Sequence, residues 1–348
     1  MSIMIEIKKQ YKEFTLGICI DGKGEALGLL GASGCGKSLT LRCIAGIITP
    51  DEGRIILNDR ILFDSSQGIN LSPRQRNIGM LFQNYALFPN MTVKENIGIG
   101  IRNRQHRREV IADLLTTFRL EALQDRYPGQ LSGGEQQRTA MARLLAYEPE
   151  ALLLDEPFTA LDSFLKEELQ QELTGMLGRY DKDIIMVSHN KEELYRFCET
   201  IAVIEQGQLL EYGSKNKIFH APEHHRTARL TGCRNLSRAV RRSEYEVEAI
   251  DWKACLRTDR IVEEDIRYVG IRPEDMIAGG SGKENRIPVS FSHFVEGPRE
   301  VSIALRSNER SDSRSLIYWT IPLQEWRRRR GKYPEYIYLP KEQILLLK

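Results

Sequence analysis

The chain has 348 residues, enough for two domains that each bury a hydrophobic core. Hydrophobic residues make up 41% of the chain and charged residues 28%, the usual balance of a soluble globular protein. The 50 lysines and arginines nearly balance the 48 acids, and the net charge of +2 excludes a global field that would favour nucleic acid or a membrane surface.

Nothing in the sequence predicts a targeting or membrane-spanning segment. No apolar run approaches the length that crosses a bilayer, and the charged start, Met1 to Lys12, lacks the apolar core of a signal peptide. The cysteines are scattered without C-x-x-C spacing, which favours reduced thiols over a disulfide framework or a zinc site. They are Cys19, Cys35, Cys43, Cys198, Cys233 and Cys255. We therefore expect the chain to stay in the cytoplasm.

A glycine-rich loop follows two predicted N-terminal strands, Ile3–Ile7 and Phe14–Ile20. Residues 31–38 read Gly-Ala-Ser-Gly-Cys-Gly-Lys-Ser, a full match to the phosphate-loop pattern G-x-x-x-x-G-K-[ST]. An apolar strand precedes the loop and a helix follows it, so loop N–H groups and the helix dipole can close around phosphate oxygens. Lys37 would reach the β- and γ-phosphates, and the Ser38 hydroxyl would enter the Mg²⁺ shell. The pattern predicts a nucleoside triphosphate, ATP, bound with Mg²⁺.

The loop and its surroundings supply the predicted nucleotide contacts. These are Tyr11, Gly31, Ser33, Gly34, Cys35, Gly36, Lys37, Ser38 and Leu39. Tyr11 is expected to stack on the adenine ring, although a half-buried tyrosine at a strand end explains the residue equally well. Cys35 lies beside Lys37 at a helix N-terminus, where a thiolate is favoured, and alkylation there should block nucleotide binding.

A buried strand over Ile78–Phe82 ends at Gln83. This amide is either a solvated strand end or a side chain that meets the metal or the attacking water, and the motifs that follow favour the second.

An amphipathic helix is predicted over Arg107–Leu120. The nearby basic cluster has no interleaved aromatic residues, so we expect a solvated face and no nucleic-acid partner. The cluster consists of Arg102, Arg104, Arg107 and Arg108.

Ser132, Gly133 and Gly134 stand at the start of another predicted helix, where free N–H groups and the dipole make a second anion site. A continuous apolar strand, Ala151–Leu154, then delivers two adjacent carboxylates that must point to opposite sides.

Of these two acids, Asp155 is expected to hold Mg²⁺ through water, and Glu156 to orient and deprotonate the attacking water. The loop Thr159–Asp162 and a helix follow. The next buried strand ends at His189, placed to reach the γ-phosphate.

With Lys37, Gln83, Ser132, Glu156 and His189 in this order, the sequence resembles the nucleotide-binding subunit of ATP-binding cassette transporters. The resemblance covers residues 1 to about 230 and implies an α/β P-loop cassette with a helical subdomain at about 84–150. Such subunits pair head to tail, which implies a homodimer enclosing ATP between the Lys37 loop of one chain and the Ser132 loop of the other.

The same resemblance places Asp162 in a loop that crosses between the two nucleotide sites of the dimer. In the family's importers, a groove near Gln83 receives a helix of the membrane permease, and the segment Tyr85–Ile97 supplies apolar side chains for that contact. The permease in turn works with a substrate-binding protein. Asn190 departs from the pattern, because many relatives carry an acid after the histidine.

From residue 231 the pattern changes to short β-rich runs separated by turns, which predicts a second domain, 231–348, folded as a small oligonucleotide-binding-like barrel. The runs are 245–250, 268–271, 287–294, 301–305, 316–321 and 336–339. Thr231–Asn235 and Val269–Asp275 resemble the regulatory extension of importer ATPases that serve molybdate and related oxyanions. Arg327–Arg330 is interpreted as a solvated loop or helix rather than an anion or lipid contact.

These features predict the ATPase subunit of a membrane importer, peripheral on the cytoplasmic face of the plasma membrane, with molybdate as the favoured cargo. Sulfate, tungstate, iron and other solutes are alternatives, because one cassette fold serves many substrates. A different class is a soluble cassette ATPase that takes no part in transport, although the chain has neither paired cassettes nor coiled-coil arms. A third is an anion-sensing module in which the second domain does the work.

Overall fold

The computed structural model describes residues 2–23, 26–82, 84–101, 105–158, 166–167, 170–171, 175, 183–279, 284–307, 316–329 and 331–348. Gln83 and Asp162 lie outside the described residues, as do Arg102, Arg104, Arg330 and most of the helix predicted after Asp162. The chain divides into two compact units, Met1–Lys215 and Asn216–Lys348.

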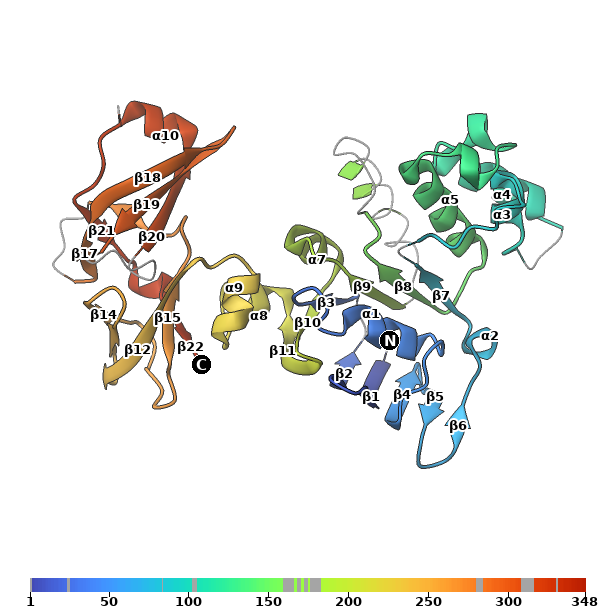
Figure 1. Cartoon of the computed structure of the whole chain (residues 1–348), viewed down its shortest axis with the longest axis horizontal. Coiled ribbons are helices and arrows are strands. Elements are labelled where there is room, and N and C mark those ends of the chain that lie inside the picture. Colours follow the sequence, from blue (N-terminus) through green and yellow to red (C-terminus); the bar gives the residue numbers. More distant parts are fainter. Residues whose placement is uncertain are drawn as a thin grey trace. The chain divides into compact units, whose positions relative to one another are not determined.

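The first unit is built on one large mixed sheet (Figure 1). Its strands are β1 Ser2–Gln10, β2 Thr15–Lys23, β3 Leu27–Leu30, β4 Glu52–Leu57, β5 Arg60–Asp64, β6 Ile69–Asn70, β7 Ile78–Leu81, β8 Ala151–Asp155, β9 Asp183–Val187, β10 Thr200–Glu205 and β11 Gln208–Ser214. Their order across the sheet is β6-β5-β4-β1-β2-β11-β10-β3-β9-β8-β7. Neighbours among β3, β9, β8 and β7 run parallel, so their carboxyl ends meet at one edge.

The residue patterns explain both halves of this sheet. Strands β3, β8 and β9 are buried along their whole length, as expected of parallel strands covered on both faces. In β1, by contrast, Ile3, Ile5 and Ile7 are buried while the residues between them face solvent, and Ile5 pairs with Ile20 of β2. The predicted N-terminal strands are therefore confirmed, and each is longer than predicted.

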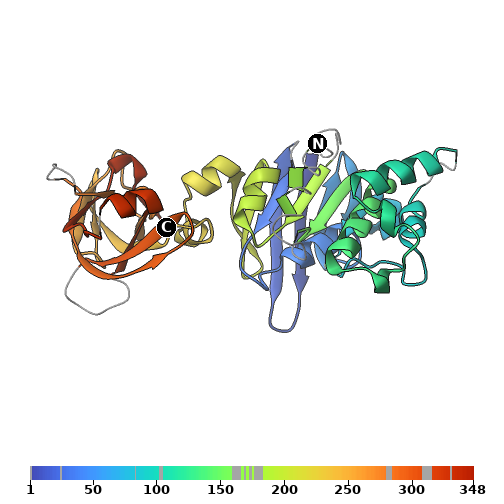
Figure 2. The same cartoon turned by 90° about the horizontal axis from the view of Figure 1, so that it is seen from above.

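Helices cover the sheet and form a group at one side of the unit. They are α1 Lys37–Ile44, α2 Pro73–Arg76, α3 Val93–Gly98, α4 Arg107–Thr117, α5 Gly133–Ala146 and α7 Lys191–Phe197, with 3-10 turns at Glu121–Leu123 and Pro128–Gln130. Helices α3, α4 and α5 contact one another, and α5 packs on β7 (Figures 1 and 2). This group occupies the residues for which a helical subdomain is predicted.

The second unit has two short helices at its start and then mainly strands. Its elements are α8 Lys215–His220, α9 His225–Leu230, β12 Asn235–Ser243, β13 Glu246–Ala249, β14 Ala254–Arg257, β15 Tyr268–Ile271, β16 Ile277–Ala278, β17 Arg286–Pro288, β18 Ser290–Glu296, β19 Glu300–Arg306, β20 Leu316–Pro322, α10 Leu323–Arg328, β21 Tyr336–Tyr338, a 3-10 turn at Lys341–Gln343 and β22 Leu345–Leu347. None of the described helices of either unit combines the length and apolar composition that a bilayer-spanning segment requires.

The described strands of the second unit form three sheets, β14-β13-β12-β15-β22, β16-β21-β17 and β18-β19-β20. They surround a core that contains the buried Trp252 and Trp319. A single oligonucleotide-binding-like barrel is therefore not confirmed. The predicted run 287–294 is two strands, because β17 pairs with β21 whereas β18 pairs with β19.

Arg76 is a fully buried cation that joins α2 to the end of α1. Its Nη1 donates to the carbonyls of Cys43 and Ile44 at 2.8 and 2.7 Å, and its Nε donates to Leu71 at 2.9 Å. These carbonyls include the last ones of α1, which have no partner within the helix. Burial lowers the pKa of Arg76, because the charged guanidinium is separated from water. The hydrogen bonds of this group to the carbonyls at the C-terminal end of α1 compensate for the loss of water.

We expect Arg76→Leu to lower the free energy of unfolding of the first unit by about 2–4 kcal/mol, because the carbonyls of Ile44 and Leu71 lose a donor and that of Cys43 keeps only the Gly46 N–H among the residues that the structure describes. Urea unfolding followed by far-UV circular dichroism measures the change. All three tryptophans, Trp252, Trp319 and Trp326, belong to the second unit, so tryptophan fluorescence should report an unchanged transition. Arg74→Leu, at an exposed position of the same helix, is the control, and an equal loss in both variants would contradict the assignment.

Candidate functional site

A cavity of about 640 Å³ lies in the first unit where the parallel strands end. Its lining residues are Phe14, Ser33, Gly34, Gly36, Lys37, Ser38, Leu39, Glu156 and His189. They come from the turn between β1 and β2, the loop that follows β3, the start of α1 and the segments after β8 and β9. The carboxyl edge of a parallel sheet is the usual place for a ligand, and the fold brings the predicted residues together there.

Two glycines let the loop take its shape. A Cβ on Gly31 would lie 2.3 Å from the carbonyl oxygen of Ile204 in β10, so only glycine fits this close approach. Gly36, at the N-cap of α1, has φ 108°, a left-handed conformation that residues with a side chain rarely adopt. The loop N–H groups therefore precede the N-terminus of α1 directly, an arrangement that binds anions.

Lys37 is folded back onto this loop. Its side chain is 7% exposed, and Nζ donates to the carbonyls of Gly31 and Ala32, both at 2.8 Å. Nζ also lies 3.8 Å from Sγ of Cys35, whose thiol is itself buried. A bound phosphate would compete with the two carbonyls for the ammonium group. Burial of the Cys35 thiol restricts access of an alkylating reagent, and the expected block of nucleotide binding stays a prediction.

Ser38, which lines the cavity, contacts Asp155, which does not line it. The Ser38 hydroxyl donates to Oδ1 of Asp155 at 2.9 Å, although the two residues are 117 positions apart. Burial at the end of β8 raises the pKa of the Asp155 carboxyl, because the charged form is separated from water. A hydroxyl and a carboxylate side by side are the hard oxygen ligands that Mg²⁺ takes in small numbers, so this donor set fits the ion.

Glu156 and His189 also line the cavity. The Nδ1 atom of His189 is 3.4 Å from Oε2 of Glu156, and the histidine side chain is 65% exposed. Glu156 has φ 53°, and its N–H donates to the carbonyl of Val187 at the end of β9 at 2.9 Å. Asn190 caps α7 by accepting from the N–H of Glu192 at 2.9 Å. An asparagine serves this capping role as well as an aspartate does.

Ser132, Gly133 and Gly134 do not line this cavity. Ser132 is the exposed N-cap of α5, where its N–H donates to Oε2 of Glu135 at 2.7 Å and its hydroxyl accepts from the Glu135 N–H at 3.4 Å. This reciprocal capping box fixes the start of the helix. The predicted helix start is thus formed apart from the cavity, with Ser132 and Gly133 exposed, and its binding of an anion stays a prediction.

The aromatic residue at the cavity is Phe14, which the sequence analysis missed. Tyr11 is 42% exposed and does not line the cavity, although its N–H donates to the Phe14 carbonyl at 2.8 Å in the same turn. The role of Tyr11 in stacking stays a prediction. Phe14 could have been singled out as an aromatic residue at the start of the second strand.

The segment Tyr85–Ile97 is held in place by two polar side chains that the sequence analysis also missed. Arg143 of α5 donates to the carbonyls of Tyr85 and Ala86 at 3.0 and 2.8 Å. The buried Asn96 of α3 accepts from the N–H of Phe88 at 2.9 Å and donates to its carbonyl at 3.1 Å. The Phe88 ring is 44% exposed, so the segment presents an apolar side chain on a fixed backbone.

In the second unit, the motif residues make internal bonds. Arg272 donates to the carbonyl of Thr231 at 3.0 Å and to that of Phe219, which ties β15 to α8 and α9. Asn235 accepts from the N–H of Tyr318 at 2.7 Å and donates to its carbonyl at 2.9 Å. These hydrogen bonds show that the motif residues help to hold the fold of the second unit together.

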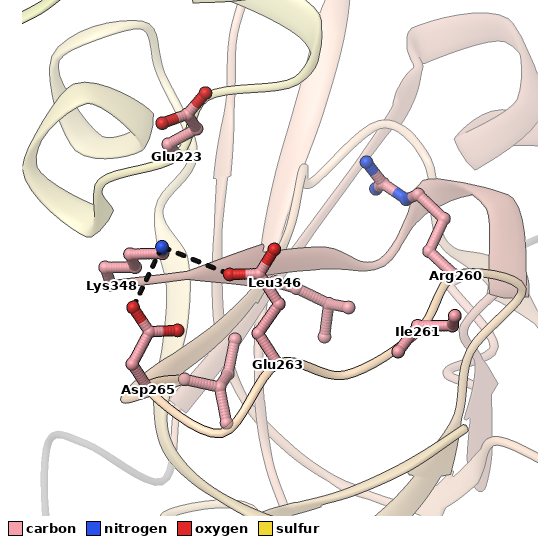
Figure 3. A pocket seen from close by; sticks show the side chains of 8 residues that line it. Glu223, Arg260, Ile261, Glu263, Asp265, Leu346 and Lys348 are labelled. Carbon is pink, nitrogen blue, oxygen red and sulfur yellow. Dashed lines mark ion pairs between the residues drawn. The ribbon is translucent and has the colours of Figure 1, made fainter. Parts of the chain in front are cut away.

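A second cavity, of about 300 Å³, lies in this unit (Figure 3). Its Lys348 ammonium is paired with Glu263 and Asp265 at 3.1 and 2.8 Å, which raises the pKa of Lys348. Arg260 donates to the carbonyl of Ile344 at 3.0 Å. Because both cations already have partners and a third acid, Glu223, also lines the cavity, its charge disfavours an oxyanion.

The chain is similar to known proteins in both sequence and fold. A family model described as ABC transporter matches residues 21–159. The Fe(3+) ions import ATP-binding protein of Haemophilus influenzae is 42% identical over 217 residues, 60% of this chain and 60% of that protein. The sulfate/thiosulfate import ATP-binding protein of a Synechocystis species is 40% identical over 230 residues, 64% of this chain and 63% of that protein.

A longer match is the spermidine/putrescine import ATP-binding protein of Haemophilus influenzae, 35% identical over 306 residues, 83% of this chain and 80% of that protein. Among solved structures, the dimeric post-hydrolysis ATP-binding cassette MJ0796, bound to ADP and Pi, matches with TM-score 0.54 and 28% identity. That match covers 62% of this chain and 99% of the cassette. The chain thus spans about three fifths of the length of the iron and sulfate relatives.

The buried Asp155 carboxylate should cost stability when no cation is bound. We expect Asp155→Asn to raise the thermal midpoint of the first unit at pH 7 by about 2–4 °C, since the amide still accepts from Ser38 without carrying a charge. Because the folded-state pKa is raised, the gain should be largest at neutral pH and should shrink as the pH falls through that pKa.

Circular dichroism melts without nucleotide or Mg²⁺, at several pH values, measure this gain. The control is Asp51→Asn, because the N–H of Gln10 and the Lys9 ammonium lower the pKa of Asp51 and its charge should not destabilise the fold. A gain for Asp155→Asn that does not change with pH would contradict the electrostatic explanation.

Proposed function

The chain belongs to the ATP-binding cassette transporter family, among the ATP-binding proteins of import systems, and from this premise we propose that it hydrolyses ATP to power the import of a solute. The observation that carries the proposal is the cavity in which Lys37, Ser38 and Glu156 come together. Its size suits a nucleotide, and its residues supply a phosphate-binding loop, oxygen ligands for a metal and a carboxylate base.

In this proposal the phosphates of ATP lie on the loop N–H groups at the start of α1. The Lys37 ammonium leaves the carbonyls of Gly31 and Ala32 and contacts the β- and γ-phosphates. Phe14 packs against the nucleotide from the β1–β2 turn, and Tyr11 is assigned to the adenine ring. The loop residues Ser33, Gly34, Cys35, Gly36 and Leu39 complete the contacts.

Ser38 and Asp155 would hold Mg²⁺, with Gln83 as a further ligand. The ion, when bound, neutralises charge on the phosphates. Among the described residues no cluster of three or more His, Cys, Asp or Glu side chains could hold a metal by itself. This agrees with an Mg²⁺ site completed by phosphate and water oxygens.

Glu156 is assigned as the general base. Its carboxylate accepts a proton from the water whose oxygen attacks the γ-phosphorus, and the bond between that phosphorus and the bridging oxygen breaks to release ADP. His189, 3.4 Å from the carboxylate, is placed to orient Glu156 and to contact the γ-phosphate. Gln83 would help to position the water.

We further propose a head-to-tail homodimer. The exposed Ser132–Gly134 segment would meet the nucleotide held by the Lys37 loop of the second chain, with Asp162 in the loop between the two sites. The dimeric state of the related cassette MJ0796 supports a dimer of this chain. ATP would then favour a closed dimer and hydrolysis an open one.

Residues 1–230 would form this nucleotide-binding domain and residues 231–348 a regulatory domain. The fixed segment Tyr85–Ile97, with the exposed Phe88, would receive an integral membrane permease that works with a substrate-binding protein. This contact would hold the chain at the cytoplasmic face of the plasma membrane. For Arg327–Arg330 we propose a solvated surface, because Arg327 and Arg328 are exposed on α10 and Arg329 pairs with Glu325 at 2.8 Å.

The cargo proposal is molybdate, on the resemblance of Thr231–Asn235 and Val269–Asp275 alone. Relatives named for iron, sulfate and polyamine import match with similar identity, so the cassette does not discriminate between cargoes. Sulfate, iron and tungstate are therefore alternatives. The acid-rich cavity of the second unit does not favour an anion-sensing module as the main function.

Glu156→Gln should lower kcat for ATP hydrolysis by about 10²–10⁴-fold, because the general base is lost while the nucleotide contacts remain. The variant should also accumulate as a dimer with ATP, seen by size-exclusion chromatography. Adding Lys37→Ala should remove ATP binding and the dimer together. Hydrolysis by Glu156→Gln at the wild-type rate would exclude Glu156 as the base.

The cargo is tested by uptake of molybdate and sulfate in cells whose sole copy of this chain carries Glu156→Gln. We expect molybdate uptake to be lost and sulfate uptake to continue, since only the transport that this ATPase powers should stop. Cells with the unmodified chain are the control. Loss of sulfate uptake alone would assign the chain to that cargo, and loss of neither would exclude both anions.

A further inference from the structure

The turn that carries Glu156 is strained and firmly held. Glu156 adopts φ 53°, a left-handed conformation that residues with a side chain adopt rarely. On one side, its N–H donates to the carbonyl of Val187 at 2.9 Å. Further along, the buried Phe158 stacks on Phe197 with ring centroids 5.3 Å apart. Such strain at a proposed catalytic base suggests that the backbone conformation itself matters for activity.

A third anchor comes from helix α5. The side chain of Gln137 is fully buried, and its Nε2 donates a hydrogen bond to the carbonyl of Pro157, the residue after Glu156. Within the described part of the chain, the Gln137 Oε1 has no hydrogen-bond partner. The bond satisfies the Pro157 carbonyl but leaves this oxygen unsatisfied, so the buried amide brings little net gain in stability. The position therefore suggests that the donated bond has a purpose beyond packing.

The same helix carries the exposed segment assigned to the second nucleotide. Ser132 is the N-cap of α5, and Gln137 lies five residues further along. A helix is rigid over this distance, so a displacement of Ser132 moves the Gln137 amide as well. One element thus contacts both the turn of the catalytic base and the segment that faces the partner chain.

We propose that Gln137 is a positioning residue that holds Glu156 in the conformation required for hydrolysis and links it to the Ser132 segment. The inference rests on the proposed function and adds a residue that the family motifs used above do not include. When α5 is seated, the Gln137 amide fixes the Pro157 carbonyl and Glu156 faces the cavity. When α5 moves, the turn loses this anchor and the carboxylate leaves the position from which it accepts the proton of water.

Gln137→Leu in the full-length chain tests the proposal. The change removes the donor at nearly constant volume. It also removes one unsatisfied buried acceptor, Oε1 of Gln137, and leaves another, the Pro157 carbonyl. The thermal midpoint should therefore change little. We expect kcat for ATP to fall by about 10- to 100-fold, as a small misplacement of a catalytic group does, with KM and ATP affinity within about twofold of wild type. Gln137→Met introduces an unbranched side chain that also lacks a hydrogen-bond donor, so it should lower kcat to a similar extent.

The matched control is Thr139→Val, on the same helix. Thr139 is fully buried, and its hydroxyl donates to the Glu135 carbonyl at 2.8 Å, so this change also removes one buried hydrogen bond. That bond lies within α5 and does not involve the Glu156 turn, so kcat should stay near the wild-type value. A Glu156→Gln chain that also carries Gln137→Leu should still dimerise with ATP, because the nucleotide contacts and the Ser132 segment are intact.

Wild-type kcat in both Gln137→Leu and Gln137→Met would overturn the positioning role. So would a joint loss of kcat, ATP affinity and thermal midpoint, because that pattern marks a residue needed only for folding. An equal fall of kcat in Thr139→Val would likewise assign the effect to helix stability. Failure of the wild-type chain to hydrolyse ATP would instead overturn the proposed function, and this inference with it.

Discussion

The site depends on one hydrogen bond, which joins the start of α1 to the end of β8 through Ser38 and Asp155. It forms only because β3, β9 and β8 run side by side in parallel, so the chain around residue 37 and the chain around residue 155 reach the same edge. Burial at the end of β8 separates the Asp155 carboxylate from water, where its charge is unfavourable without a cation, and the hydrogen bond from Ser38 offsets part of that cost. The fold thus accepts an unfavourable group at the point where a metal and phosphates would offset it.

The parts of this site that could be predicted from sequence are those set by local pattern. A run such as Ala151–Leu154 is apolar at every position, which favours a strand buried on both faces and places the following acids at its carboxyl end. The phosphate loop is similarly local, because Gly36 and Lys37 act through backbone shape over a few residues. These patterns need no knowledge of the rest of the fold, and the structure brings their residues together in one cavity.

What could not be predicted depends on contacts between distant segments. Phe14 reaches the cavity through the packing of the β1–β2 turn, and Arg143 reaches the Tyr85 carbonyl across the helical group. In the second unit, the alternation over 287–294 is continuous, yet the strand divides because its two halves pair with different partners. The residue pattern sets the tendency of a segment to form a strand, whereas the tertiary structure determines which other strand it pairs with. The internal bonds of Arg272 likewise show how a motif can serve folding.

Helix α5 explains why residues of different roles occur within one short stretch of sequence. Its first turn presents Ser132, its middle holds the turn of Glu156 through Gln137, and its last turns hold the backbone at Tyr85 through Arg143. Separate loops at these three places could move independently, whereas a single helix with buried side chains moves as one body. Since two arrangements of a packed helix can differ by only a few kcal/mol, a ligand that contacts one end can shift the other two places without touching them. If the proposed roles hold, placing these three residues on one rigid element makes their positions change together.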